Sequence, residues 1–494
     1  MSIRVLLGTA ACLTLAGCAL KIPPFGAAIA PDAARQIPAE WAGPHHSGAV
    51  VPNWVRTFHD PELSALVADA VERNPDLKAA AARVEASRAA VRIAAASLYP
   101  RIAMKGLGER QGQEISGDLG RGINPPDFGP PGTENPGGSG LDTSMDESSQ
   151  RWVYGLAAGA AWEADVWGRI RAKKAAAVAE SGALEADYEF ARQSLAAAVA
   201  RAYFSTIEAA QQEANAQETL EIYQEYTKLT DEQKQQGHAS DFDVAQIKSR
   251  TASAQDALYI AQQARAQTIR AIEVVTSHYP AGRFHVRRSF PTQPGSVPAG
   301  LPAQLLERRP DLIASERRFA AAFHRVHEAR TARLPRIVLS ATGGLGTAQL
   351  DGVGSLDAVI WSLAGGITQP IFFGGELKAA QDLRTAEQKA AAASYVGTGL
   401  RAFQDVEDAL SNDYYLRKRE GALADAVSSS SESVNLAGKQ LEQGQIDMFT
   451  ILRLGGENLA AKIQLTQVRA SRLRERVNLY LALGGDFAGT DALK

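Results

Sequence analysis

An internal duplication is the feature that most constrains how this 494-residue chain can fold. Pro75 and Pro100 are separated by the same interval as Pro310 and Pro335, and the residues around the two pairs are similar. Further matches follow in the same order: Trp167–Ile170 with Phe373–Leu377, Arg201–Tyr203 with Arg401–Phe403, Gln236–Gly237 with Gln443–Gly444, and Phe242 with Phe449. This length often means two or three domains, but ordered matches indicate two copies of one unit, at residues 61–278 and 303–484.

Each copy is predicted to contain the same series of elements. A helix begins at a Pro-Asp pair, because proline suits the first helical turn and aspartate favours its positive end. Two strand-like segments follow, within about residues 98–165 and 336–370. A very long helix comes next, from about Arg169 to Gln236 and again from about Glu376 to Gln443. At ~1.5 Å per residue, each of these helices is roughly 100 Å long.

The long helices are predicted to turn back on themselves. Gly237 and Gly444 are placed to end them as helix C-caps. Ser240 and Asp447 can cap the returning helices, and Ser240 with Asp243 makes a capping-box-like pair. The remaining expected segments are helical hairpins at about 169–277 and 376–482, a proline-rich linker at 279–302, and a tail at 485–494.

The strand segments have the residue alternation that is typical of membrane-spanning β-strands. The even positions of residues 152–162 are apolar, with aromatic residues at both ends, as in a lipid-facing barrel strand. Residues 357–369 have a similar apolar face at Val359, Trp361, Leu363 and Ile367. The alternative for each strand is a soluble antiparallel sheet with one buried face. The candidate residues of the aromatic girdle are Trp152, Tyr154, Trp162 and Trp361.

Four strands cannot close a barrel by themselves, because barrels start at about eight strands and open edges are not tolerated in lipid. The strands must then be pooled between chains, and three copies would supply twelve. The expected fold is therefore mainly α with a membrane β-barrel. Long helical hairpins form an α-barrel, and four strands per chain contribute to a trimeric, twelve-stranded β-barrel.

Residues 106–150 interrupt the first strand pair and are rich in glycine, proline and acidic residues. The corresponding turn in the second copy, near residues 349–356, is short. Barrel loops of unequal length usually face outward, so we expect both to be extracellular. The alternative for the longer one is a disordered linker.

The N-terminal residues have the three parts of a secretory signal. Arg4 supplies a positive charge, Val5–Leu15 is an apolar stretch too short to span a bilayer, and small residues precede Cys18. Leu15–Cys18 resembles the bacterial lipobox, which implies cleavage before Cys18 and a lipid on its thiol. The alternative is an ordinary signal with an incidental cysteine.

The lipobox resemblance divides the N-terminal region into a signal peptide at residues 1–17 and a lipid-anchored segment at residues 18–60. Cys12 would leave with the signal, so no free thiol would remain in the oxidising periplasm. Ala19 stands where aspartate would favour retention at the inner membrane. The resemblance therefore points to the outer membrane.

Other classes of function have little support. A formal net charge of −3 offers no basic excess for binding nucleic acid. His324 and His327 are three positions apart, but no carboxylate or cysteine is spaced to complete a metal site. Gly343–Gly346 resembles a phosphate loop only loosely and lies in a strand pattern. We therefore expect no enzyme activity, no metal and no cofactor apart from the covalent lipid.

Several segments together resemble the TolC-like outer-membrane efflux family, in its NodT-like lipoprotein branch. The resemblance covers nearly the whole mature chain, and each motif is weak alone but specific in this order and in duplicate. The segments are Trp54–Asn74, Pro75–Pro100, Trp162–Arg171, Leu305–Asp311, Gln369–Leu377, Ala402–Leu410 and Leu479–Gly485.

The resemblance implies a homotrimeric channel that continues from the outer membrane into the periplasm. Its implied partners are outer-membrane lipid, a periplasmic membrane-fusion adaptor and an inner-membrane efflux pump, commonly of the resistance-nodulation-division class. The implied cargo is small toxic molecules. The alternatives are a periplasmic coiled-coil structural or adaptor lipoprotein without a channel, and the outer-membrane duct of a type I protein secretion system.

The hairpin tips are the expected gate and docking surface. The family's adaptor contacts centre on the tips, which implies docking at Gly237, Ser240, Gly444 and Gln445. Threefold symmetry would repeat each tip carboxylate as a ring that favours cations in a narrow pore. The candidate aperture carboxylates are Asp241, Asp243 and Asp447, with the alternative that they are solvated helix caps.

The glycine pair Gly455-Gly456 departs from the family pattern, because it falls inside the last long helix. Each glycine costs roughly 1 kcal/mol relative to alanine in a helix. The pair predicts a soft point or bend near the tip, and the alternative is a tolerated defect.

Overall fold

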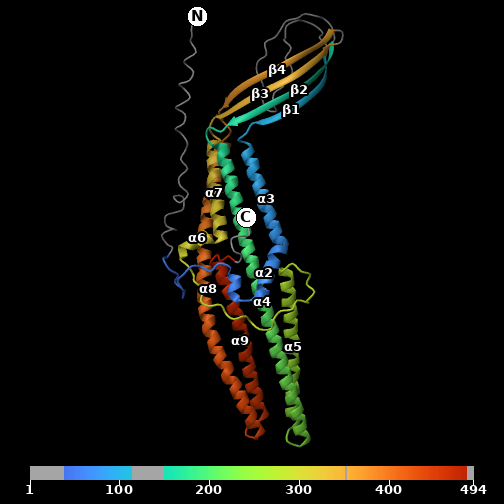
Figure 1. The fold of residues 1–494 in the computed structure, drawn as a ribbon, viewed down its shortest axis with the longest axis vertical. Coiled ribbons are helices and arrows are strands. Elements are labelled where there is room, and N and C mark those ends of the chain that lie inside the picture. The colour runs from blue at the N-terminus through green and yellow to red at the C-terminus, as the bar shows by residue number, and fades with distance from the viewer. Residues whose placement is uncertain (1–37, 114–148, 351–352, 487–494) are drawn as a thin grey trace. The chain divides into compact units, whose positions relative to one another are not determined.

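The structure is a computed structural model, and it describes residues 38–113, 149–350 and 353–486. Long helices dominate these residues, and four strands form one sheet (Figure 1). Across the described ranges, no helix has the length and apolar character needed to cross a membrane. The chain divides into two compact units, which are described separately: a sheet unit within residues 86–181 and 318–392, and a hairpin unit within residues 38–85, 182–317 and 393–486.

The two copies contain matching elements. The long helices have 67 residues each, and the returning helices have 35 residues each. The first copy contains α2 (Pro61–Arg73), α3 (Pro75–Ala96), β1 (Arg101–Gln113), β2 (Ser149–Ala164), α4 (Arg169–Gln235) and α5 (Asp241–Val275). The second contains η4 (Pro302–Gln304), α6 (Leu305–Arg308), α7 (Pro310–Thr331), β3 (Arg336–Leu350), β4 (Val353–Thr368), α8 (Glu376–Glu442) and α9 (Met448–Ala482), and η3 (Trp54–Phe58) precedes both copies.

The sheet unit is built on an antiparallel sheet with the order β1-β2-β3-β4. Its register brings together the two apolar faces that the sequence indicated separately. Leu156 of β2 pairs with Leu345 of β3, which pairs with Val359 of β4. Neighbouring pairs follow the same rule, so the even positions of β2 and the odd positions of β4 share one side of the sheet.

The opposite side of the sheet carries mostly small and polar residues, with Val338 and Ile360 as apolar exceptions. Thr342 and Ser362 lie opposite each other in the register, and their hydroxyls are hydrogen-bonded at 2.6 Å. Gly159 and Gly344 also lie on this side. The sheet is thus amphipathic, with its two faces set by strand alternation.

Two tryptophans tie the strands to the helices of the sheet unit. The Trp162 indole N–H donates to the Leu98 carbonyl at 2.9 Å, and the Trp167 indole N–H donates to the Pro335 carbonyl at 2.7 Å. Asp165 accepts the backbone N–H groups of Ile170 and Arg171, both at 2.9 Å, which satisfies free donors at the start of α4. The Asp165 carboxylate therefore supplies hydrogen-bond acceptors where the chain changes from strand to helix.

The hairpin unit has an aromatic core where its long helices contact two other segments, residues 38–60 and 279–302, which we call the belt. Trp54 stacks on Tyr480 of α9 with ring centroids 5.8 Å apart, and Phe58 packs on Phe204 of α4 at 5.2 Å. Asp60 is buried and accepts hydrogen bonds from the Tyr203 hydroxyl and from Arg287, both at 3.0 Å. One carboxylate therefore joins both belt segments to α4.

Residues 279–302, the proline-rich linker expected from the sequence, lie packed against the helices of the hairpin unit. Val297 and Ala299 are buried in the core, and the Trp41 indole N–H donates to the Ala299 carbonyl at 3.3 Å. The buried Arg476 donates to the Gly295 carbonyl at 2.8 Å. Proline content predicts an extended conformation, whereas these long-range contacts keep the segment packed on the helices.

We expect replacement of Gly455 and Gly456 by alanine to raise the midpoint of thermal unfolding of the purified protein. Helix α9 is unbroken across both positions, and a Cβ at either would meet nothing within 4 Å. Each substitution should stabilise the helix by about 1 kcal/mol. Gly484→Ala is the matched control, and it should lower the midpoint, because Gly484 has φ of 67° and its Cβ would lie 3.1 Å from the Arg308 carbonyl carbon. Lower stability of the double variant would contradict the soft point.

We expect Glu273→Gln to destabilise the protein at pH 7, because Glu273 holds the start of the second belt segment. It accepts the backbone N–H groups of Gly282, Arg283 and Phe284 at 2.7, 2.8 and 3.1 Å. Burial opposes ionisation of this carboxyl, but the three hydrogen bonds outweigh it and hold the pKa below its ordinary value of 4.5.

A lowered pKa in the folded state stabilises the fold above the ordinary pKa, and this stabilisation is lost as the pH falls through the lowered pKa. The gap in thermal midpoint between wild type and Glu273→Gln should therefore narrow below about pH 4.5. Glu72→Gln, at an exposed position on α2, is the control and should follow the wild-type pH profile. A gap that does not change with pH would contradict the proposed role of the carboxylate.

Candidate functional site

The first hairpin tip joins α4 to α5 through a left-handed glycine. Gly237 has φ of 78°, its N–H donates to the Lys234 carbonyl at 2.9 Å, and the His238 N–H donates to the Gln233 carbonyl at 2.8 Å. These two bonds form a Schellman motif, which favours glycine. Ser240 and Asp243 then form the expected capping box at the start of α5.

The second tip joins α8 to α9 in the same way. Gly444 has φ of 71° and donates to the Leu441 carbonyl at 2.9 Å, and the Gln445 N–H donates to the Gln440 carbonyl at 2.9 Å. Asp447 caps α9 by accepting the Thr450 N–H at 2.7 Å. The two tips therefore have the same local structure, as the duplication requires.

The two tips meet through an aromatic pair. The rings of Phe242 and Phe449 have centroids 6.5 Å apart and are inclined at 50°. These residues hold matching positions in the two copies, and Phe242 is 71% exposed. Both tips lie at one end of the hairpin unit (Figure 1), so all four predicted docking residues occupy one surface region: Gly237, Ser240, Gly444 and Gln445.

The three candidate aperture carboxylates each have a local partner. Asp241 forms an ion pair with Lys234, and hydrogen bonding and charge from this lysine hold the pKa of Asp241 below its ordinary value. Hydrogen bonds from the Ser240 backbone and hydroxyl lower the pKa of Asp243, and bonds from Thr450 lower that of Asp447. All three are therefore ionised at neutral pH. Asp447 caps α9, and Asp243 is the capping-box partner of the Ser240 cap on α5. The role of these carboxylates in an aperture stays a prediction.

The candidate girdle residues lie in the sheet. Trp361 is 76% exposed on the apolar side, next to the similarly exposed Val359 and Leu363. Trp162 is half-buried, and its indole N–H donates to the Leu98 carbonyl. Trp152 and Tyr154 belong to β2, but their side chains lie outside the described residues, and so does Cys18.

The described residues contain no group of three or more His, Cys, Asp or Glu side chains that could hold a metal ion. His324 and His327 lie on α7, where burial lowers the pKa of both. The pair therefore has no further ligand within the part of the chain that is described.

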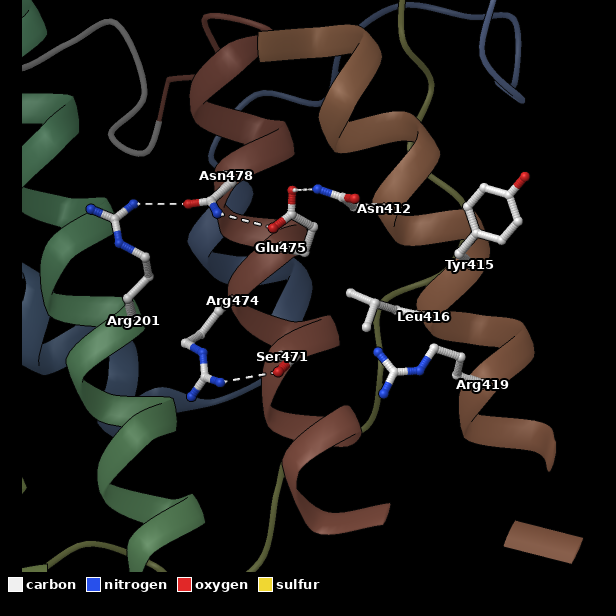
Figure 2. A pocket seen from close by; sticks show the side chains of 9 residues that line it. All are labelled: Arg201, Asn412, Tyr415, Leu416, Arg419, Ser471, Arg474, Glu475 and Asn478. Atoms are coloured by element: carbon white, nitrogen blue, oxygen red, sulfur yellow. Dashed lines mark hydrogen bonds between the residues drawn. The ribbon is translucent and has the colours of Figure 1, made fainter. Parts of the chain in front are cut away.

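The sequence did not indicate a polar groove of about 520 Å³ on the hairpin unit. Its walls come from α4, α8 and α9, and it contains three arginines, Arg201, Arg419 and Arg474 (Figure 2). The three helices are far apart in the sequence, so no local motif could have predicted the groove. Helical periodicity would have shown only that each arginine lies away from the apolar face of its own helix.

Comparison with known proteins agrees with this architecture. The chain is 30% identical to outer membrane protein OprJ of Pseudomonas aeruginosa, over 96% of this chain and 94% of that protein. It is 30% identical to the solvent efflux pump outer membrane protein SrpC of Pseudomonas putida, over 97% of each. The solved structure of the outer-membrane channel OprN matches with a TM-score of 0.79 at 26% identity, covering 91% of this chain and 97% of that one.

The family profile described as outer membrane efflux protein matches two stretches, residues 66–277 and 301–485. These stretches overlap the two copies that the sequence indicated. Together they span most of the chain, and they contain the sheet, both long helices and both tips. The chain belongs to the outer membrane efflux protein family.

Proposed function

We propose that this protein is the outer-membrane exit channel of a tripartite efflux system, and that it passively conducts small toxic compounds to the exterior. The observation that carries the proposal is the amphipathic four-stranded sheet with two open edges. Family membership and the channel fold of its structural neighbours support it. No nucleotide-binding motif is evident in the sequence, so the energy would come from the partner pump.

The sheet is suited to a shared barrel. Trp361, Leu363 and Ile367 are each more than 70% exposed on one side, which fits contact with lipid. Most residues on the other side are small or polar, which fits a water-filled interior. Strands β1 and β4 are the edges, and in lipid these edges require partners. A homotrimer would pair β4 of one copy with β1 of the next and give twelve strands.

The helices of the hairpin unit form a side-by-side array that the same symmetry would close. Cross-helix ion pairs establish the order α5-α4-α9-α8: Arg265 with Glu213, Lys462 with Glu218, and Arg472 with Glu420. Helices α5 and α8 are the ends of this array. In a trimer, α8 of one copy would pack on α5 of the next, and twelve helices would surround a tube that extends into the periplasm.

The joined tips are proposed to be both the gate and the docking surface for a periplasmic membrane-fusion adaptor. Their left-handed glycines hold the loops short, and Ser240 and Gln445 are exposed beside them. The ionised Asp241, Asp243 and Asp447 would repeat around the threefold axis and favour cations at the aperture. Attachment to an inner-membrane pump follows from the adaptor.

Cleavage before Cys18 would leave a lipid on its thiol and anchor the chain to the outer membrane, with the long helices in the periplasm.

The names of relatives include a solvent efflux pump outer membrane protein, which supports small toxic compounds as cargo. Selection among such compounds would belong to the pump.

Outer membranes extracted in mild detergent should yield a trimer that migrates intact without heating and as a single chain after boiling. Cys18→Ala should remove the lipid, yet the variant should stay embedded in the membrane, because the sheet would anchor it independently. Electrophoresis with and without heating, and alkaline extraction of the membranes, measure the two effects. A freely soluble monomer after Cys18→Ala would contradict the channel and favour a periplasmic coiled-coil lipoprotein.

Cysteines at Ser240 and at Gln445 should cross-link in intact cells to an adaptor, which peptide sequencing of the adduct would identify. The proposed lipidation of Cys18 leaves no competing thiol in the mature chain. Gln262→Cys is the control, because it is exposed on α5 but lies roughly 33 Å along the helix from Ser240. Equal capture from Gln262→Cys, or capture of no adaptor at the tips, would contradict docking at the tips.

A further inference from the structure

The polar groove on the hairpin unit has walls from three helices and holds a continuous hydrogen-bonded chain of side chains (Figure 2). Arg201 of α4 donates to the Asn478 amide oxygen at 3.0 Å, and Asn478 donates to Glu475 at 3.2 Å. Asn412 of α8 donates to the other oxygen of Glu475 at 3.1 Å. This chain fixes the walls and orients Arg201 toward the groove.

The charges of the groove are not balanced. Arg474 forms an ion pair with Glu208, but Arg201 bonds only to a neutral amide. No hydrogen bond or ion pair to another described residue is found for Arg419. Glu475 is the single carboxylate among the lining residues, and amide groups occupy both of its oxygens. Two guanidinium groups therefore face the groove without a carboxylate partner in the described chain.

The groove lies on the side of the helices that faces away from the belt. Leu473, Val477 and Tyr480 of α9 are buried on the belt side. Glu475 follows Leu473 by two positions, which is roughly 200° around the helix. Arg201 similarly precedes the buried Tyr203 of α4 by two positions. The lining side chains of both helices thus point away from the aromatic core.

The location of the groove in the assembly rests on the proposed function. A belt on the inner side of each copy would occupy the bore of the proposed open tube, so we place the belt outside it. The side opposite the belt, with its groove, then faces the lumen. Threefold symmetry would place six guanidinium groups without carboxylate partners at one level of the conduit.

We infer that this groove is a lumenal binding site for multivalent anions, in which Arg201 and Arg419 hold phosphate, sulfonate or carboxylate groups of passing solutes. Guanidinium groups suit these ligands because their planar N–H donors match two oxygens of the anion at once. Rings of arginine are a general means by which pores favour anions. Burial lowers the pKa of Arg201, but a guanidinium stays protonated at neutral pH. The conduit would thus carry an anion site well away from its acidic tips.

Binding of inorganic tripolyphosphate to the full-length protein in detergent, measured by titration calorimetry at low ionic strength, tests this site. Wild type should bind saturably, and Arg201→Gln/Arg419→Gln should bind about tenfold more weakly or not at all. Arg250→Gln, at an exposed position on α5, changes the charge in the same way and should bind as wild type does. Glu475→Gln should bind more tightly, because it removes the one repelling carboxylate, and a misfolded variant would not show this gain.

This experiment tests the anion site independently of the proposed channel, because the groove lies within one chain and binding does not require assembly. Absence of saturable binding, or equal binding by wild type and the double variant, would overturn the anion site. Sedimentation of the same samples reports the oligomeric state. A trimer without binding would contradict the anion site alone, whereas a monomer whose binding depends on Arg201 and Arg419 would support the site and contradict the channel.

Discussion

The unpaired edges of the four-stranded sheet govern what this protein must do to be stable in a membrane. Strands β1 and β4 each have a partner on one side only among the described residues. Backbone N–H and C=O groups cannot be left without partners in hydrocarbon, so in the proposed channel strands from other chains would complete the amphipathic sheet. In the proposed trimer, association would also give neighbours to α5 and α8, the two ends of the helical array. Closure of the sheet and closure of the helices would thus follow from one constraint.

The belt determines which face of each helix is left free. It covers the sides of α4 and α9 that hold Tyr203, Leu473 and Tyr480, and it is attached through the buried groups Asp60 and Arg476. Polar side chains on the opposite sides are left to line a groove with an excess of guanidinium groups. Because the tips are acidic, the proposed conduit has two regions of opposite charge. The groove arises because helical periodicity places these polar side chains on the side opposite the apolar one.

The elements and the tips were predictable because their causes are local. Gly237 and Gly444 are needed where the chain turns with positive φ. Ser240 and Asp447 cap helices, and Asp243 completes the capping box three residues after Ser240. The groove, the Phe242–Phe449 contact and the packing of residues 279–302 were not predictable, since each joins segments far apart in the sequence. Trp162 was partly predictable: the sequence indicated its strand and its face of the sheet, but not its hydrogen bond to Leu98.

The sequence by itself determined the duplication, the long hairpins, the alternation of the strands and the family to which the chain belongs. These properties depend on residue order and backbone conformation, which repeat with fixed periods. Only the tertiary structure decided that both apolar strand faces lie on one side of the sheet, that the expected linker packs on the helices, and that two arginines without carboxylate partners line one groove. These features depend on strand register and on the rotation of helices about their axes, which are set by contacts between distant residues.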